Sequence, residues 1–143
     1  MNPLEYIDSP EIHFPQSTKD VGILNEDAAC HYIEAQNFRI VARNFQCKSG
    51  EIDIIATNES EKLISFIEVK YRKSEYNGHL YGYNSDSSIS FTKKRKIIKT
   101  AEFFLQKYQS YQEYFGRFDA ILIHSKGESQ KEIQYIKNAF TPG

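Results

Sequence analysis

The sequence predicts one α/β domain in which a mixed β-sheet carries helices packed on its faces. Its 143 residues are the usual length of a single domain, and 40% hydrophobic with 26% charged residues is typical of a globular protein with a real core. Apolar patterns follow the order helix, three strands, helix, and one or two strands, with no internal repeat. This order favours helices on the faces of one mixed sheet.

The N-terminus is expected to form an irregular arm, because residues 1–16 hold three of the four prolines and show no periodicity. The folded domain then spans 17–143. A first helix is predicted from Ser17 or Thr18, either of which can cap it, and its spacing rests on Leu24, Ala28 and Ala35. Asn37 suits the left-handed conformation that often ends a helix.

Three strands are predicted after this helix. Residues 38–46 are rich in β-branched and aromatic side chains, and the turn-forming Lys48-Ser49-Gly50 follows them. Strands at about 51–57 and 63–72 are joined by a short polar segment, which predicts a hairpin. Residues 74–90 are Gly, Ser, Asn and Tyr without apolar periodicity, so they are expected to form a long mobile loop with a functional role.

A second helix is predicted from Phe91 or Thr92 to Tyr111, because one apolar stripe runs along it and the opposite face is basic and polar. That stripe comprises Ile97, Ala101, Phe104, Leu105 and Tyr108. Residues 117–124 form a buried type of strand, and 132–140 hold a last short strand or an irregular edge.

Composition and motifs exclude several classes of protein. No stretch approaches the roughly 20 apolar residues of a membrane span, and the N-terminus lacks the pattern of a signal peptide, so we expect a cytoplasmic protein with no membrane partner. Cys30 and Cys47 lack the spacing of a zinc site and are expected to be reduced packing residues. No motif of a serine nucleophile is present, and a net charge of −1 gives no overall signature of nucleic-acid binding.

One face of the 63–72 strand changes from apolar to charged side chains. Because successive side chains alternate, this face holds Ile64, Phe66, Glu68 and Lys70. A turn in the polar segment sets Asp53 opposite Phe66 or Glu68, so two acids and a lysine converge. An ionised Asp53 among isoleucines is costly unless Lys70 or a divalent metal compensates it.

The first helix adds a third acid to this region. Glu26 shares a stripe with small and apolar side chains, so it is able to face the same cleft; the stripe comprises Gly22, Ala29, Cys30 and Ile33. A cluster of Glu26, Asp53 and Glu68 suits Mg²⁺ or Mn²⁺, which prefer carboxylate oxygens and keep several waters. The alternative is a solvated sheet edge or a cross-strand ion pair without function.

A run of basic side chains opens the second helix, where positive charge opposes the helix dipole. Nucleic-acid phosphates would remove that penalty and would bind without any reading of sequence. The alternative is an ordinary solvated face. The residues expected to contact nucleic acid are Arg43, Arg72, Lys93, Lys94, Arg95 and Lys96.

Together these residues resemble the PD-(D/E)-x-K nuclease core, and specifically the YraN-like family of uncharacterised bacterial proteins (UPF0102), which is similar to Holliday-junction resolvases. The resemblance covers about residues 20–140, with Ile52 in place of the proline of the motif's name. It is carried, in chain order, by Glu26, Arg43-Asn44, Gly50-Glu51-Ile52-Asp53, Glu68-Val69-Lys70-x-Arg72, Lys93 and Arg117-Phe118-Asp119.

The resemblance implies a restriction-endonuclease-like fold, with a mixed central sheet flanked by helices. It also implies roles for five residues. Asp53, Glu68 and the carbonyl of Val69 would bind the metal. Lys70 would orient the attacking water or stabilise charge on the phosphate, and Glu26 would complete the acidic cluster.

We therefore predict a metal-dependent endonuclease that hydrolyses phosphodiester bonds in DNA, with branched or junction structures as candidate substrates and Mg²⁺ or Mn²⁺ as the cofactor. A homodimer is expected because relatives that cut junctions make two cuts and need two sites. Two alternatives stay open. One is a catalytically silent nucleic-acid-binding module, and the other is a partner-binding protein in DNA uptake or repair.

Overall fold

A computed structural model describes residues 18–73, 89–125 and 131–142 of the chain. Two α-helices, one short 3₁₀ helix and five strands make up the described part. In chain order they are α2 (Thr18–Ala35), β1 (Arg39–Cys47), β2 (Gly50–Asn58), β3 (Leu63–Lys73), α3 (Phe91–Lys107), η1 (Gln109–Tyr111), β4 (Phe115–Ser125) and β5 (Lys131–Phe140).

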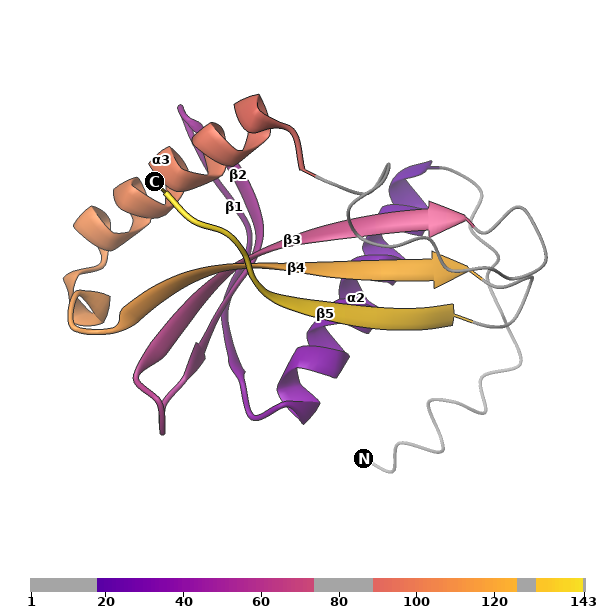
Figure 1. Cartoon of the computed structure of the whole chain (residues 1–143), viewed down its shortest axis with the longest axis horizontal. Coiled ribbons are helices and arrows are strands. Elements are labelled where there is room, and N and C mark those ends of the chain that lie inside the picture. The colour runs from indigo at the N-terminus through magenta and orange to yellow at the C-terminus, as the bar shows by residue number, and fades with distance from the viewer. Residues whose placement is uncertain (1–17, 74–88, 126–130, 143) are drawn as a thin grey trace.

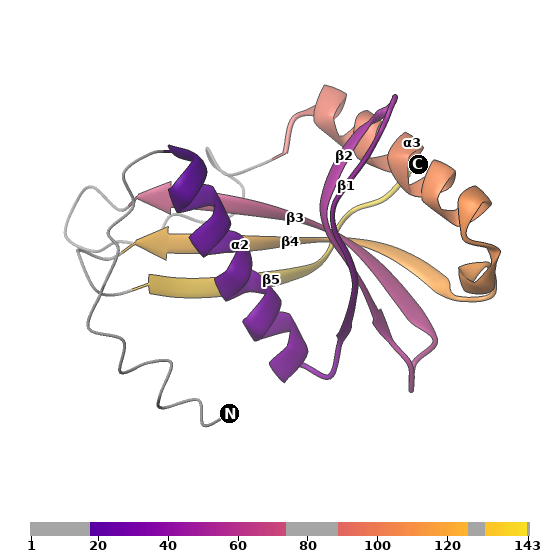
Figure 2. The ribbon, with the colours of Figure 1, turned by 180° about the vertical axis from the view of Figure 1, so that it is seen from behind.

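The five strands form one twisted sheet in the order β1-β2-β3-β4-β5 (Figure 1). Strands β3 and β4 pair in parallel, and the other three pairs are antiparallel. Helix α2 packs on one face of this sheet and α3 on the other, as the view from behind shows (Figure 2). The predicted class is confirmed: this is an α/β architecture compatible with a single-domain restriction-endonuclease-like fold.

The predicted end of the first helix is also confirmed, because Asn37 has a φ of 70° two residues after α2 ends at Ala35. Cys30 is a buried free thiol and Cys47 a partly buried one. None of the helices in the described ranges is long and apolar enough to span a membrane. The predicted N-terminal arm and residues 74–88 of the predicted loop lie outside the described residues.

Two elements differ from the sequence-based prediction. Helix α3 ends at Lys107 rather than Tyr111, because Tyr108 leaves helical geometry, with φ −115° and ψ 83°, and a 3₁₀ turn follows. The last segment is a ten-residue edge strand, longer than predicted, and it carries the irregularity that was the predicted alternative: its register with β4 shifts between Phe118 and Ala120, and Asn138 has a φ of 54°. Its pairing with β4 extends from Ser125↔Lys131 to Phe118↔Phe140, and this non-local ladder overrides a weak local pattern.

Two apolar clusters fill the space between the sheet and its helices. The α3 side contains Phe66, Ile97, Phe104 and Phe118, whereas the α2 side contains Ile33, Ile54, Ile67 and Ile121. Ile64 and Phe66 therefore face α3 while Leu63 and Ile67 face α2. This confirms the alternation predicted for the first part of β3.

Helix α3 approaches the β1–β2 turn closely at Gly50. A Cβ atom added to Gly50 would lie 3.3 Å from both Lys96 Cβ and Thr100 Oγ1, and the φ of Gly50 is +151°. A larger residue would strain the backbone and crowd the helix. Glycine at this turn therefore helps to fix the position of α3 over the sheet.

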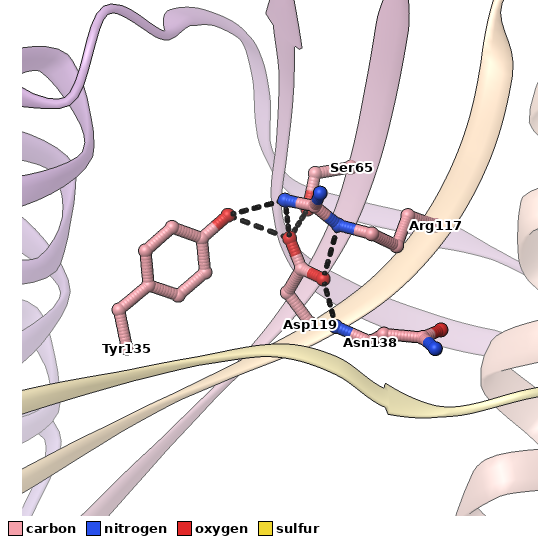
Figure 3. Close-up of polar contacts among 5 residues, drawn as sticks. All are labelled: Ser65, Arg117, Asp119, Tyr135 and Asn138. Carbon is pink, nitrogen blue, oxygen red and sulfur yellow. Dashed lines mark hydrogen bonds and ion pairs between the residues drawn. The ribbon is translucent and has the colours of Figure 1, made fainter.

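A buried polar network on the α2 side joins three strands around Asp119 of β4 (Figure 3). Its carboxylate accepts hydrogen bonds from Ser65 Oγ of β3 and, at 2.6 Å, from Tyr135 Oη of β5. The backbone N–H of Asn138 donates at 2.7 Å, and the guanidinium of Arg117 donates at 2.8 and 3.0 Å. These bonds satisfy a carboxylate that is fully buried.

Candidate active site

Asp53 and Glu68 lie side by side at the point where the pairing between β2 and β3 stops. The ladder runs from Asn58↔Leu63 to Ile54↔Ile67, one residue short of the two acids. Beyond it, the backbone N–H of Val69 donates a 2.8 Å hydrogen bond to Oδ2 of Asp53. The side chain of Asp53 thus takes the place of the next ladder bond, and the predicted convergence of the two acids is observed.

Glu68 is almost completely buried and forms an ion pair with α3. Its side chain is 4% exposed, and Oε2 lies 2.9 Å from Nζ of Lys93, whose side chain is 49% exposed. The position of Lys93 depends on the start of α3, where the Ser90 hydroxyl accepts a hydrogen bond from the Lys93 N–H. A capped first turn therefore holds a lysine over the acidic pair.

The environment of Asp53 favours its protonated form. Burial is the largest cause, and a hydrogen bond and the negative charge of Glu68 add to it, so the pKa of Asp53 rises to about 8 although the Val69 N–H and Lys93 work against this. Burial lowers the pKa of Lys93, but the hydrogen bond and charge of Glu68, together with the nearby acids Asp53 and Glu51, raise it, and the net pKa is raised. At neutral pH Asp53 therefore keeps its proton, beside Glu68 and the ammonium group of Lys93.

Lys70 lies two residues beyond Glu68 on β3, so alternation places it on the same face of the sheet. Its side chain is partly buried and forms no hydrogen bond or ion pair with the other residues that the structure describes. Arg72, two residues further, donates a 3.0 Å hydrogen bond to the carbonyl of Tyr71. Within the described residues, the ammonium group of Lys70 therefore stays available on the face that carries Glu68.

Glu26 lies on the α2 side of the sheet and has other partners. Its Oε1 accepts hydrogen bonds from Arg43 Nε at 3.1 Å and from Asn44 Nδ2 at 2.8 Å. Arg43 also binds Asp27 at 2.6 Å, and Asn44 has a φ of 51° in β1. The structure thus brings Asp53 and Glu68 together and groups Glu26 with two residues of β1.

No three His, Cys, Asp or Glu side chains gather as a metal-binding group within residues 18–73, 89–125 and 131–142. Two carboxylates are nevertheless enough for a hard divalent ion that keeps most of its waters. The carbonyl oxygen of Val69 is a further candidate metal ligand. A residue in a strand directs its N–H and C=O to the same neighbour, and the N–H of Val69 already points at Asp53.

The expected nucleic-acid-binding residues lie in three places. Lys94, Arg95 and Lys96 occupy the first two turns of α3, where Lys94 lies over the ring of Phe140 and Arg95 over that of Phe91. Arg43 is held by the acids of α2, and Arg72 lies near the end of β3. Lys93 differs from its neighbours because it points inward to Glu68.

Sequence reasoning missed this inward role of Lys93. The residue was grouped with its basic neighbours, although its spacing carried the signal: positions 93, 97, 100 and 104 follow one helical face, and Ile97, Thr100 and Phe104 are buried. A lysine on the apolar stripe of a helix needs an acidic partner in the core. The network around Asp119 was missed similarly, since only the acid's place inside an apolar strand hinted at it.

The chain is similar to members of one protein family. The sequence model of the uncharacterised protein family UPF0102 matches residues 25–123. The chain belongs to this family. It is 42% identical over 123 residues to a UPF0102 protein of Clostridium botulinum strain Loch Maree, covering 85% of this chain and 94% of that protein. A UPF0102 protein of Clostridium perfringens strain 13 is 39% identical over the same shares.

The resemblance to the YraN-like UPF0102 family is thereby confirmed. The region matched by UPF0102 contains both acids of the pair, Lys70 and Lys93, and ends within β4. Tyr135 and Asn138, which complete the Asp119 network from β5, follow that region. UPF0102 is described as uncharacterised, so family membership assigns no reaction.

Proposed function

We propose that this protein is a metal-dependent endonuclease that hydrolyses phosphodiester bonds in DNA. The buried pair of Asp53 and Glu68 carries the proposal, because two adjoining buried acids, of which Asp53 has a raised pKa, suit a divalent cation better than they suit a sheet edge. Lys70 on the same face and the basic start of α3 add positive charge where a phosphate would bind.

Mg²⁺ or Mn²⁺ fits this donor set. Asp53 and Glu68 would hold the ion, with the carbonyl of Val69 as a further ligand. A bound ion would supply an activated water and a Lewis acid for the phosphate. Asp53 must lose its proton before both acids bind as anions, and Lys93 must leave Oε2 of Glu68 or share it.

The chain's own cations would act on the phosphate. The Lys70 ammonium would stabilise the negative charge that develops on the phosphate oxygens, because a lysine acts there as a compact point charge. Lys93, once released from Glu68, would contact the same phosphate or a neighbouring one from the first turn of α3. Glu26 would act indirectly, by holding Arg43 against α2.

The test is a cleavage assay with Mg²⁺ and Mn²⁺ on labelled four-way junctions, flaps, single strands and duplexes. Asp53→Asn, Glu68→Gln and Lys70→Met are each expected to lower the rate by about 10²–10³-fold. Glu61→Gln and Lys107→Met, which change exposed residues away from the pair, should cleave like the wild type. Equal cleavage by all proteins would reveal a contaminating nuclease and would refute the proposal.

A second candidate, a nucleic-acid-binding module without turnover, is favoured by one observation. The ion pair between Glu68 and Lys93 satisfies the buried acid without any metal. This candidate predicts salt-sensitive DNA binding and no rise in melting temperature with millimolar Mn²⁺. The endonuclease proposal predicts that millimolar Mn²⁺ raises the melting temperature. Glu68→Gln should abolish this rise, and Glu61→Gln should leave it intact.

Branched DNA as the substrate and a homodimer as the active form are part of the proposal. A dimer would provide two sites for two cuts across a junction. Sedimentation of the protein alone and with a four-way junction checks this part. A monomer that binds the junction one to one would contradict it.

A further inference from the structure

A groove lies between the N-terminal half of α3 and the end of β5. It has a volume of about 590 Å³. Its walls are Phe91, Lys94, Arg95 and Ile98 from the helix and residues 139–142 from the other side. A second hollow of about 200 Å³ shares Phe91 and Arg95 with the groove and adds Thr92, Lys96 and Lys99.

Phe91 stands between these two hollows with its ring in solvent. Its residue is 73% exposed, although phenylalanine is a side chain that folding normally buries. By contrast Phe140, which lines the groove opposite, is 8% exposed and stacks on Phe118 with ring centres 5.0 Å apart. The groove thus has a buried aromatic side chain, Phe140, on one side and an exposed one, Phe91, on the other.

Among the residues that the structure describes, the charged side chains around Phe91 are all basic. Lys94, Arg95, Lys96 and Lys99 line the two hollows, and no acid from the described ranges does. Arg95 Cζ lies 5.9 Å from the centre of the Phe91 ring, and Lys94 Nζ lies 5.7 Å from that of Phe140. Cations beside an exposed aromatic ring such as Phe91 complement a polyanion with flat, stackable groups.

We propose that this groove binds an unpaired stretch of the nucleic-acid substrate, with one base stacked on Phe91 and the flanking phosphates on Lys94 and Arg95. A duplex keeps its bases stacked on one another and offers only phosphates to the protein. The exposed ring of Phe91 therefore favours binding of unpaired segments over duplex. The inference rests on the proposed function. It makes structures with single-stranded segments the preferred substrates.

The groove adjoins the acidic pair through one turn of α3. Lys93 points inward to Glu68, and the next residue, Lys94, points to the groove. A strand that leaves a duplex near Glu68 and Lys70 would therefore meet Phe91 on the other side of the same helical turn. The cut would fall close to a junction between paired and unpaired DNA.

The experiment measures binding without turnover. Fluorescence anisotropy in EDTA, with proteins that all carry Asp53→Asn, compares a labelled single strand, a flap and a duplex. Phe91→Ala is expected to weaken binding of the single strand by about 5- to 100-fold and that of the duplex by less than about 2-fold. Phe91→Tyr should restore binding of the single strand.

A matched control is Phe115→Ala, because Phe115 is 68% exposed but lies outside both hollows, at the start of β4. It should bind every probe like the parent protein. Lys94→Ala should weaken all probes and reduce the salt dependence by about one phosphate contact, whereas Phe91→Ala leaves the salt dependence unchanged.

Two results would overturn the inference: an equal loss for single strand and duplex with Phe91→Ala, or displacement of the single strand by an acidic peptide as readily as by unlabelled DNA. Neither depends on cleavage. A protein that binds as expected but never cuts DNA would refute the proposed endonuclease and leave the groove assignment intact.

Discussion

The Nζ atom of Lys93 lies 2.9 Å from Oε2 of Glu68, so a cation from α3 neutralises a buried acid of β3. The contact joins the crossover helix to the strand that carries the candidate site. It also places an internal positive charge where the proposed metal would bind. Lys93 therefore has a structural role in the metal-free protein, and under the proposed function it would take a different one when a metal or phosphate binds.

Replacement of Lys93 by methionine tests this role. In EDTA, Lys93→Met should lower the free energy of unfolding by about 1–2 kcal/mol, less than for a fully buried pair because half of the lysine side chain is exposed. Millimolar Mn²⁺ should then raise its melting temperature more than that of the wild type, since no ammonium competes for Glu68. Lys99→Met, a change at an exposed residue of the same helix, is the control. An equal loss of unfolding free energy in Lys99→Met would contradict a stabilising role of the Lys93–Glu68 ion pair.

The raised pKa of Asp53 predicts a stability that falls with increasing pH. The folded state holds the proton up to about pH 8, whereas an unfolded Asp loses it near 3.8, so the folded state binds more protons between these values. The stabilising contribution is complete below about pH 4 and is lost as pH rises to about 8. Denaturant unfolding in EDTA measures it.

Asp53→Asn is the matched variant for this measurement, because the amide does not titrate. The difference in unfolding free energy between Asp53→Asn and the wild type should shift in favour of the variant as pH rises from 4 to 8. Glu61→Gln, at an exposed turn, should follow the wild type. Parallel pH profiles for Asp53→Asn and the wild type would show that Asp53 keeps an ordinary pKa.

The network around Asp119 predicts a large loss of stability on truncation. Asp119→Ala leaves the Arg117 guanidinium and the Tyr135 hydroxyl without their acceptor and should cost about 3–5 kcal/mol. Adding Arg117→Met should recover part of this loss, because the unpaired charge is removed. Additive losses in the double variant would contradict a shared network.

Tyr135→Phe separates the hydroxyl from the ring. It should cost about 1 kcal/mol, the usual value of one hydrogen bond, since the ring contacts with Phe38 and Tyr32 remain. Tyr32→Phe is the control and should change stability by less than about 0.5 kcal/mol. Urea unfolding measures both losses, and equal losses for Tyr135→Phe and Tyr32→Phe would show that the Tyr135 hydroxyl contributes nothing specific to stability.

The cap of α3 predicts separate effects on folding and binding. Ser90→Ala removes the acceptor of the Lys93 N–H and should cost about 1 kcal/mol. Ser90→Asp keeps a cap and adds a negative charge at the helix start, so it should preserve or raise stability. The same charge should weaken DNA binding, and unchanged affinity would argue against phosphate contacts at this turn.

Much of the fold follows from local patterns in the sequence. Alternation on β3 placed Ile64, Phe66 and Glu68 on one face, and the polar segment after β2 fixed the hairpin that brings Asp53 to Glu68. The stripe predicted for α3 identified the buried Ile97, Ala101 and Phe104 but not the buried Thr100. Each of these patterns spans a few residues, which is the range over which side-chain periodicity is informative.

Contacts between distant segments could not be predicted in this way. The pairing of Lys93 with Glu68 and that of Glu26 with Arg43 depend on where each helix lies over the sheet. The full length of β5 depends on β4 as its partner, because its own residues alternate weakly. Such relationships are set by packing and register, for which a single sequence carries no periodic signal.

The parallel pairing of β3 with β4 has a consequence for synthesis of the chain. The ladder extends from Leu63↔Phe115 to Lys73↔Ser125. Because α3 lies between β3 and β4 in the chain, β3 cannot pair with β4 until α3 has been synthesised. During translation the β1–β2–β3 meander would emerge first. The backbone N–H and C=O groups on the edge of β3 that pairs with β4 would then lack hydrogen-bond partners. Ribosome-bound chains that end before Phe115 should therefore recruit chaperones or aggregate, and chains that extend past β5 should not.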